Sequence, residues 1–263
     1  MDLGLKGKAA LVCGASSGLG KAVAMGLARE GARVAICART EEKLTRAAEQ
    51  IRRETGAEVV ATTADVSVPA QVKKLLQKTV SQFGKLDILV TNAGGPPFGY
   101  FLDLPEESWQ QALEMNLLST LHLCREAVPH MKAAGGGRII NITSFAAKQP
   151  QDGLILSNMA RAGVLGLAKS LANELAPHNI LVNTVCPGAI ETERHFALAE
   201  RRAAKEGVPV EKILETRAKE IPLQRAGKPE EFADLVVFLA SERASYITGT
   251  AIQIDGGVVR SLL

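Results

Sequence analysis

Short apolar runs alternate with longer amphipathic stretches along most of the chain. The run Ala9–Cys13 precedes an amphipathic stretch over 21–30, and Arg33–Cys37 precedes a second one over 41–55. Runs that are apolar throughout are typical of strands covered on both faces of a parallel sheet, whereas apolar positions three or four residues apart predict helices. The chain therefore begins with a β-α-β-α pattern.

The same alternation continues toward the carboxyl terminus. Further strands are predicted at 58–62, 86–90, 137–142, 180–185 and 252–254, and further helices at 69–83, 106–134 and 158–176. Because parallel βα units connect by right-handed crossovers, the pattern predicts an α/β Rossmann fold, a doubly wound seven-stranded parallel sheet with helices on both faces. Ligands of such sheets bind outside the carboxyl ends of the strands, where we expect the functional site.

The alternation breaks between Ile190 and Leu223, where the sequence becomes charged and rich in alanine. This segment directly follows a strand, so we expect a helical substrate lid over about 190–223. A solvated helical hairpin with no gating role is the alternative. Since no linker or internal repeat interrupts the pattern, we expect residues 1–263 to form a single domain.

Composition is that of an ordinary globular protein, with 46% apolar residues, 22% charged residues and a net charge of +3. Basic residues are interspersed with acidic ones, as in Glu41-Glu42-Lys43, and form no stripe that would indicate a nucleic-acid partner. The amino terminus lacks the apolar region of a signal peptide, and no apolar run is long enough for a membrane span. We therefore expect a soluble, cytoplasmic protein.

The chain has four widely separated cysteines, namely Cys13, Cys37, Cys124 and Cys186. Three of the four lie in apolar strand-like runs. Such positions are typical of buried thiols in a reducing compartment, and zinc-type spacing is absent. We expect no metal site, although one of the thiols acting as a nucleophile remains a minor alternative.

A glycine-rich loop, Gly14-Ala15-Ser16-Ser17-Gly18-Leu19-Gly20, follows the first predicted strand and opens the first predicted helix. Glycines at this junction allow a sharp turn, a close approach of backbone N–H groups to a pyrophosphate, and close packing of helix on sheet. The loop thus predicts dinucleotide binding, although a glycine loop alone is also compatible with a purely structural βα turn.

The spacing of these glycines resembles that of the short-chain dehydrogenase/reductase (SDR) superfamily, and the resemblance extends from about Lys6 to Gly257. It includes Asp65-Val66, Asn92-Ala93-Gly94-Gly95, Asn116, Ser144, Pro187-Gly188 and Ile254-Asp255-Gly256-Gly257. The resemblance implies that Asp65 and Val66 flank the adenine. It also implies that Asn92, Ala93 and Gly94 support the sheet and the adenosine side, and that Pro187 and Gly188 contact the nicotinamide.

The end of the second predicted strand distinguishes the two nicotinamide dinucleotides. An acidic residue there would hydrogen-bond the ribose of NAD and repel a 2′-phosphate, but this chain has Ala38 followed by Arg39. A guanidinium can grip a phosphate with two hydrogen bonds, and Ser16 or Ser17 can add a hydroxyl donor. NADP(H) is therefore favoured over NAD(H), unless Arg39 only caps a solvated turn.

The SDR resemblance implies a catalytic tetrad of Asn, Ser, Tyr and Lys, of which two members are recognisable. Asn116 matches the asparagine that anchors a water, and Ser144 matches the serine that polarises the substrate. Taken singly, each is also compatible with a polar residue that satisfies nearby backbone groups.

The other two tetrad positions differ from the family pattern. Aligning the segment 162–171 with the family's helix places Ser157 at the tyrosine position and Arg161 at the lysine position, and the only tyrosines, Tyr100 and Tyr246, are distant in sequence. An aliphatic hydroxyl is a much weaker acid than a phenol. Arg161 would keep a positive charge near the nicotinamide ribose of the cofactor, but arginine cannot relay a proton.

A water held by Ser157, or a side chain outside the motif, would then supply the proton. Tyr100, Lys148 and His195 are such side chains, which we expect on loops at the carboxyl ends of the strands, although a surface role is the more ordinary interpretation of each.

Three functions follow from this combination. The leading hypothesis is an atypical NADP(H)-dependent SDR oxidoreductase that acts on a small carbonyl or alcohol substrate and resembles 3-oxoacyl-[acyl-carrier-protein] reductases. A catalytically impaired dinucleotide-binding sensor or partner subunit is the alternative, and dehydration or epimerisation in the same pocket ranks third. The resemblance also implies a homotetramer, with Val164–Leu171 in an interface, although this run is equally compatible with intrachain core.

Overall fold

A computed structural model describes residues 1–262 of the chain and contains one seven-stranded parallel sheet with the strand order β3-β2-β1-β4-β5-β6-β7. Every neighbouring pair of strands is parallel. The strands are β1 Ala9–Cys13, β2 Arg33–Ala38, β3 Val59–Thr63, β4 Ile88–Thr91, β5 Gly137–Ile142, β6 Ile180–Pro187 and β7 Ala251–Ile254. The predicted doubly wound Rossmann fold is confirmed.

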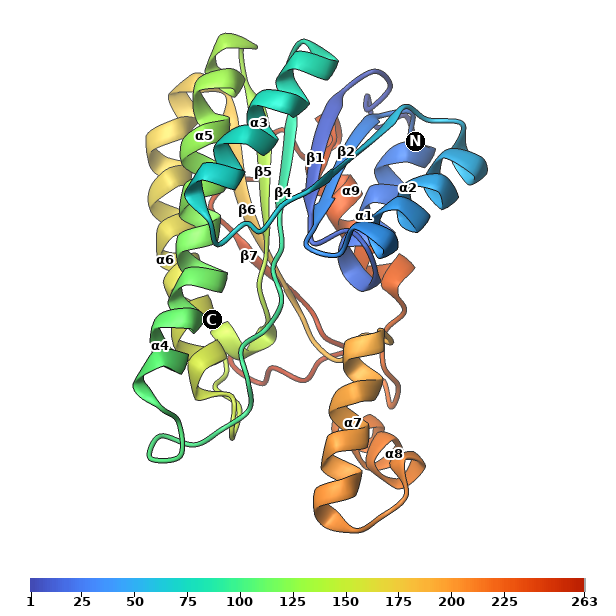
Figure 1. The fold of residues 1–263 in the computed structure, drawn as a ribbon, viewed down its shortest axis with the longest axis vertical. Helices are drawn as coiled ribbons and strands as arrows, with labels where there is room; N and C mark the ends of the chain where they lie inside the picture. Colours follow the sequence, from blue (N-terminus) through green and yellow to red (C-terminus); the bar gives the residue numbers. More distant parts are fainter. Residues whose placement is uncertain (263) are drawn as a thin grey trace.

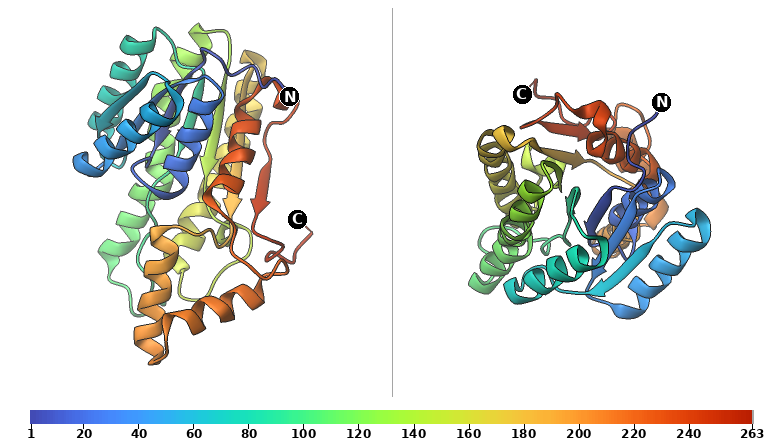
Figure 2. Two further views of the ribbon diagram at one scale, coloured as in Figure 1. Left: turned by 90° about the vertical axis from the view of Figure 1, so that its right-hand side faces the viewer. Right: turned by 90° about the horizontal axis from the view of Figure 1, so that it is seen from above.

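Helices cover both faces of the sheet (Figures 1 and 2). One layer contains α1 Gly18–Arg29, α2 Glu41–Thr55 and α9 Pro229–Ala240, and the other contains α3 Pro69–Phe83, α5 Ser119–Ala133 and α6 Ile155–Leu175. Successive strand residues point to opposite faces, so Val12 joins the apolar core beneath the first layer and Leu11 the core beneath the second. Burial on both faces explains why the strands are apolar throughout.

The predicted helix over 106–134 is divided in the structure. It consists of α4 Glu106–Ala112, a π-helical turn Leu113–Leu118, and α5, which contains Pro129. The sequence pattern did not reveal the π-helical turn, because one extra residue in a turn changes the apolar spacing only slightly. Short 3₁₀ turns also occur at Phe145–Ala147, Ala176–His178 and Glu242–Ala244.

Helix α9 was missed in the sequence. Pro229 occupies its first turn and the Glu231 side chain accepts a hydrogen bond from the Lys228 backbone N–H, which is a recognisable helix start. Phe232 and Val236 of this helix are fully buried in the core shared with α1. The proline and the glutamate three residues beyond Lys228 were the available sequence signals.

Residues 190–223 form two helices, α7 Glu193–Glu206 and α8 Val210–Glu220, which project beyond the carboxyl ends of the strands (Figure 1). They share a small apolar cluster of their own, formed around Ala199, Ala203 and Ile213. The ends of the excursion are tied together, because Glu191 N–H donates to Gly227 O and Gly227 N–H donates to Ala189 O, both at 2.9 Å. We call residues 190–223 the lid segment.

All four cysteines are buried and free, as predicted. In the described part of the chain, no helix combines the length and apolarity needed to cross a membrane.

Candidate active site

The glycine loop lies between the carboxyl end of β1 and the start of α1, and its glycines are sterically required. A Cβ on Gly20 would overlap the Gly14 carbonyl oxygen, and a Cβ on Gly14 would lie 2.7 Å from Asn92 Nδ2. Gly14 and Gly18 have positive φ values of 59° and 53°, which side chains disfavour. The loop can therefore form only where these positions lack side chains.

Polar groups in this loop are left free for a ligand. Asn92, after β4, donates from Nδ2 to the carbonyl oxygens of Cys13 at 3.3 Å and Gly14 at 3.2 Å, which fixes the loop against the sheet. Ser17 is the N-cap residue of α1, yet its side chain makes no capping hydrogen bond. The first-turn N–H groups of α1, including those of Leu19 and Gly20, thus have no side-chain acceptor among the described residues and favour an anion.

Arg39 and Asp65 lie at the carboxyl ends of adjacent strands, β2 and β3, at the far side of the loop from α6. Arg39 is exposed and makes no ion pair among the described residues. Burial opposes ionisation of Asp65, but hydrogen bonds from Ser67 and the charge of Arg39 leave its pKa below the usual value. Val66 packs on the sheet core, as a residue flanking a planar ring can.

Asn116 lies in the π-helical turn, where it is 5% exposed. Its Nδ2 donates to the carbonyl oxygen of Gly94 at 2.7 Å, and its Oδ1 is buried with no hydrogen-bond partner in the described part of the chain. A buried acceptor without a partner is costly, and an ordered water is the usual remedy. The geometry fits the water-anchoring role that the sequence suggested.

Ser144 follows β5 and caps the 3₁₀ turn Phe145–Ala147. Its Oγ accepts a hydrogen bond from the Ala146 backbone N–H at 3.1 Å, and its hydroxyl hydrogen has no acceptor among the described residues. Ser144 therefore does satisfy a nearby backbone group, which is the structural role that the sequence also allowed. It leaves the O–H free to donate to a substrate oxygen.

Ser157 and Arg161 lie one turn apart on α6, and Arg161 Nε donates to Ser157 Oγ at 3.2 Å. Arg161 Nη1 also donates to the carbonyl oxygens of Thr143 at 2.7 Å and Ile142 at 3.5 Å. Burial, together with the nearby charge of Arg194, lowers the pKa of Arg161 to about 10, so the guanidinium stays charged at neutral pH. Arg161 thus anchors Ser157 to the end of β5.

The carboxyl ends of β6 and β7 border the site beside β5. Gly188 N–H donates to Ile254 O at 3.0 Å, and a Cβ on Gly188 would lie 2.7 Å from Asp255 Cα. Cys186, before Pro187, contacts the Thr143 hydroxyl at 3.2 Å. Burial raises the pKa of Cys186, although Thr143 and the charges of Lys148 and Arg161 oppose the shift, so the group is a thiol at neutral pH.

Arg194, in the first turn of α7, lies in the segment 190–223, where the sequence assigned no role to any individual residue. Its Nη1 donates to the carbonyl oxygen of Gly95 at 3.3 Å, and a Cβ on Gly95 would lie 2.6 Å from Arg194 Cζ. The contact joins residues 99 positions apart, so no local sequence signal could have revealed it.

The three side chains considered as other proton sources lie at this end of the sheet. Tyr100 is exposed and stacks edge-on against Phe98. Lys148 follows the 3₁₀ turn after Ser144. His195 lies within α7 rather than on a loop, and burial and the charge of Arg217 lower its pKa despite the opposing charge of Glu191. None of them makes a hydrogen bond to Ser157 among the described residues.

The structure therefore divides the predicted site residues into two groups. Ser144, Ser157 and Arg161 meet around the ends of β5 and α6, and Asn116 approaches through its bond to Gly94. Arg39 and Asp65 lie across the glycine loop, at the ends of β2 and β3. Such a division suits an elongated ligand that spans the point where the strand order reverses.

Comparison with known proteins agrees with this geometry. The family model described as Enoyl-(Acyl carrier protein) reductase matches residues 14–259. A relative from Oryctolagus cuniculus, dehydrogenase/reductase SDR family member 4, is 37% identical, with 96% of this chain and 94% of that protein covered. The 3-oxoacyl-[acyl-carrier-protein] reductase FabG of Thermotoga maritima is also 37% identical, with 97% and 99% covered.

Solved structures show the same fold. L-sorbose reductase from Gluconobacter frateurii, complexed with NADPH and L-sorbose, superposes with a TM-score of 0.96 at 36% identity and with 100% of both chains covered. A single-residue variant of actinorhodin polyketide ketoreductase with NADPH superposes with a TM-score of 0.93 at 34% identity, with 97% of this chain and 98% of that chain covered. The chain belongs to the SDR superfamily of oxidoreductases, whose members use a nicotinamide dinucleotide.

Proposed function

We propose that the protein is an NADP(H)-dependent oxidoreductase that interconverts a carbonyl and an alcohol, with chemistry like that of 3-oxoacyl reductases. The observation that carries this proposal is the position of the free Ser144 hydroxyl beside Ser157 and Arg161, on the side of the glycine loop opposite Arg39. One group of residues suits hydride chemistry on a substrate oxygen, and the other suits the phosphate end of a dinucleotide.

The residues around the glycine loop fit a dinucleotide. Gly14 and Gly20 approach each other too closely for side chains, and the first-turn N–H groups of α1 have no side-chain acceptor in the described part of the chain. Gly14, Ser16, Ser17, Gly18, Leu19 and Gly20 would hold the pyrophosphate, while Asp65, Val66, Asn92, Ala93 and Gly94 would border the adenosine and Pro187 and Gly188 the nicotinamide. When bound, the cofactor supplies or accepts a hydride.

The preference for NADP(H) rests on Arg39. Its guanidinium is exposed, makes no ion pair in the described part of the chain, and follows Ala38 rather than an acidic residue. Asp65 acts on it only as a nearby charge. A 2′-phosphate would give the guanidinium a direct anionic partner. The complexes of L-sorbose reductase and the polyketide ketoreductase with NADPH are consistent with this preference.

On the substrate side, the chain's own residues position an oxygen and deliver a proton. Ser144 donates its hydroxyl hydrogen to the substrate oxygen, and Asn116 orders a water through its unpartnered Oδ1. Ser157 holds a second water, which protonates the oxygen as the carbonyl is reduced and is reprotonated from solvent. Arg161 supplies positive charge and the anchor for Ser157, because an arginine of pKa about 10 does not exchange protons efficiently at neutral pH.

The proposal extends to the lid segment and to assembly. As part of the one domain, α7 and α8 would cover the substrate, since Arg194 at the base of α7 already contacts Gly95. We also propose a homotetramer. Val164 and Ala168 are buried in the chain's own structure, so an interface on α6 would use outward residues such as Ala162 instead.

The test of this function is NADPH oxidation by the purified protein with ketones, aldehydes and 3-oxoacyl thioesters. We expect turnover of at least one class, and we expect Ser144→Ala to lower kcat by about 10²-fold, because a hydrogen bond to a developing charge is lost. Affinity for NADPH, measured by fluorescence titration, should not change. Absence of oxidation with every substrate, in protein that is folded and binds NADPH, would contradict the proposal.

A second candidate is a catalytically impaired dinucleotide-binding sensor or partner subunit. The observation that favours it is the commitment of Arg161 to Ser157 Oγ and to the Thr143 carbonyl oxygen, which leaves fewer donors for a reaction. The same assay separates the two candidates. Turnover that disappears in the Ser144→Ala variant while NADPH still binds would exclude the sensor.

A further inference from the structure

Two arginines at the proposed substrate side, Arg161 and Arg194, have no carboxylate partner. Neither makes an ion pair among the described residues. Arg161 donates to Ser157 Oγ and to two backbone carbonyl oxygens, and Arg194 donates to Gly95 O. Arg161 is half-buried, and Arg194 is accessible to solvent. An uncompensated charge in a partly buried site is unfavourable unless a ligand of opposite charge completes it.

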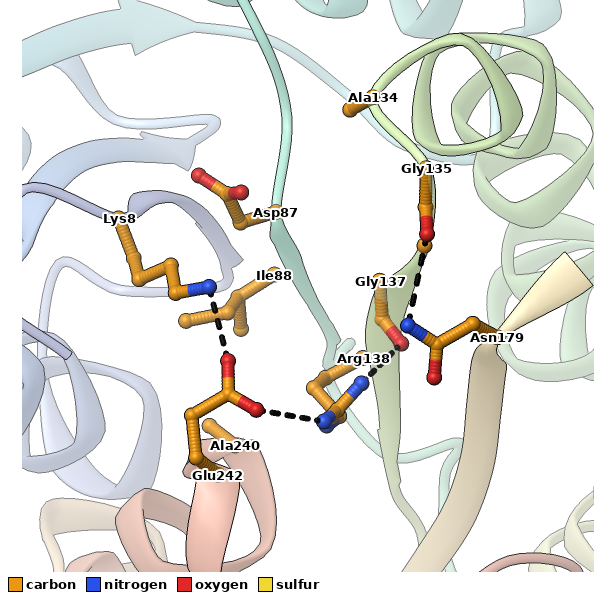
Figure 3. Close-up of a pocket in the computed structure, with 11 residues that line it drawn as sticks. Lys8, Asp87, Ile88, Ala134, Gly135, Gly137, Arg138, Asn179, Ala240 and Glu242 are labelled. Carbon is orange, nitrogen blue, oxygen red and sulfur yellow. Dashed lines mark hydrogen bonds and ion pairs between the residues drawn. The ribbon is translucent and has the colours of Figure 1, made fainter. Parts of the chain in front are cut away.

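A pocket at the amino ends of the strands, opposite the proposed site, contains cations with a purely structural role (Figure 3). There Lys8 Nζ lies 2.9 Å and Arg138 Nη2 lies 3.5 Å from the carboxylate oxygens of Glu242. Lys85 is likewise paired with Asp87 at 2.9 Å. Each of these cations is neutralised within the chain, in contrast to Arg161 and Arg194.

The two unpaired guanidinium groups lie beyond the carboxyl ends of neighbouring strands, since Arg194 binds Gly95 after β4 and Arg161 binds Thr143 after β5. The charge of Arg194 contributes to the lowered pKa of Arg161, and partial burial together with the charge of Arg201 lowers the pKa of Arg194. Lys148 adds a third positive charge, near Cys186. Like charges gathered in one site oppose each other, and a bound anion would relieve that repulsion.

The acidic groups of this region offset these cations only in part. Asp255 lies near Cys186, but its two carboxylate oxygens accept hydrogen bonds from the N–H groups of Gly257 and Val259, both at 2.9 Å. Glu191 lies near His195, before α7, and makes no ion pair in the described part of the chain. The three cations Arg161, Arg194 and Lys148 outnumber the carboxylates Asp255 and Glu191, so these groups together leave an excess of positive charge at the carboxyl ends of β4, β5 and β6.

We propose that the substrate carries an oxyanion, a carboxylate or phosphate close to its carbonyl or hydroxyl carbon, and that this group binds to Arg194 with support from the charge of Arg161. The inference rests on the proposed function, because it assigns the substrate class of the same site. Arg194 is a specificity-determining residue. Because it belongs to the lid segment and contacts Gly95 beyond the end of β4, an anion at this point would also link α7 to the sheet.

The experiment compares oxo acids with their neutral esters. Steady-state rates with NADPH are measured for 2-oxo, 3-oxo and 4-oxo acids and for the methyl ester of each, with wild-type protein and with Arg194→Gln. Arg202→Gln is the matched control, since Arg202 lies on the same helix and pairs with the exposed Glu206. A second arm uses calorimetry to measure binding of malonate and of inorganic phosphate to NADP⁺-saturated protein.

We expect kcat/KM for at least one acid to exceed that of its ester by about tenfold or more, which is the usual effect of a charge-assisted hydrogen bond. Arg194→Gln should remove this advantage by lowering kcat/KM for the acid about tenfold more than kcat/KM for its ester. Arg202→Gln should behave as wild type. Malonate or phosphate should bind to wild-type protein and bind at least about tenfold more weakly to Arg194→Gln.

The outcomes separate this inference from the proposed function. Equal rates with acids and esters, and no binding of malonate or phosphate, would overturn the inference while the oxidoreductase stands. Weaker NADPH binding in Arg194→Gln, with no change toward substrates, would show that the arginine contacts a cofactor phosphate and would also overturn it. Anion binding that depends on Arg194, without turnover of any carbonyl, would support the anion site and contradict the proposed function.

Discussion

The glycine loop and the pair of residues Ser157 and Arg161, which we call the α6 pair, both lie at the carboxyl ends of the strands. They are built in different ways. Backbone atoms form the loop, where Gly20 packs directly on the Gly14 carbonyl group and Asn92 holds that carbonyl in place. Side chains form the α6 site, where Ser157 and Arg161 bind each other and the end of β5. A backbone cradle tolerates few residues at its close contacts, whereas a side-chain site can change its chemistry without altering the fold.

Replacing the α6 pair should have the largest effect on the reaction. In the double variant Ser157→Tyr with Arg161→Lys, a phenol replaces the much less acidic serine hydroxyl, and an amine replaces the guanidinium. We expect kcat for the best carbonyl substrate to rise by about 10²- to 10⁴-fold, the usual contribution of general acid catalysis. The rise is measured by NADPH oxidation at saturating substrate.

The matched control is Ser157→Phe with Arg161→Lys, which adds the same ring without a hydroxyl. Because Ser157 is only 8% exposed, both variants must enlarge a buried position, and thermal denaturation will show whether they do so equally. Equal rates for the phenylalanine and tyrosine variants would mean that the α6 pair does not limit proton transfer.

A single added methyl group in the glycine loop should weaken cofactor binding. In Gly20→Ala the new Cβ would overlap the Gly14 carbonyl oxygen, so the loop must move and its N–H groups must leave their positions. We expect NADPH affinity to fall by about 100-fold, the equivalent of two lost hydrogen bonds to a charged group, as measured by fluorescence titration.

Gly166→Ala provides the control for this variant. Gly166 lies inside α6, and apart from its chain neighbours and the adjacent backbone of its own helix, no atom in the described part of the chain lies within 4 Å of the position that its Cβ would occupy. The alanine should stabilise the helix by about 0.5–1 kcal/mol and leave cofactor affinity unchanged. If Gly20→Ala bound NADPH as well as Gly166→Ala does, the cradle would not be the cofactor site.

The smallest effect on cofactor binding is expected for Arg39, a single side chain beside the glycine loop. Arg39→Ala should weaken NADPH binding by about tenfold and leave NADH binding nearly unchanged, because only a 2′-phosphate needs the guanidinium. The ratio of the two dissociation constants measures the effect. Arg46→Ala, which removes an exposed arginine of α2 paired with Glu42, should not change that ratio, and an unchanged ratio for Arg39→Ala would reject the NADP preference.

The contrast between the two regions also explains which features the sequence predicted. The strands and their parallel arrangement were predicted from apolar runs such as Ala9–Cys13, because a parallel sheet buries both faces. The glycine loop was recognised because its close contacts restrict the residue type. Ser144, Asn116, Ser157 and Arg161 were located from motif positions. The structure adds that Asn116 lies in a π-helical turn and that its Oδ1 has no partner among the described residues.

Features that depend on tertiary contacts were beyond the sequence. The contact of Arg194 with Gly95 brings the start of α7 and the segment after β4 together through folding alone. The charge balance around Arg161 is apparent only when its neighbours are known. Helix α9 is a different case, because Pro229 and Glu231 mark its start and a closer examination of 229–240 would have found it.

The hydrogen-bonded closure at Ile190 and Gly227 has a consequence for how proteins of this architecture diversify. Since the excursion leaves and returns at one point, its length and composition can change without altering the path of β6 or the packing of α9. Its small internal cluster gives it a separate, weaker source of stability. The segment is thus an exchangeable module, which evolution or an engineer can replace to alter substrate choice while the cofactor scaffold is inherited intact.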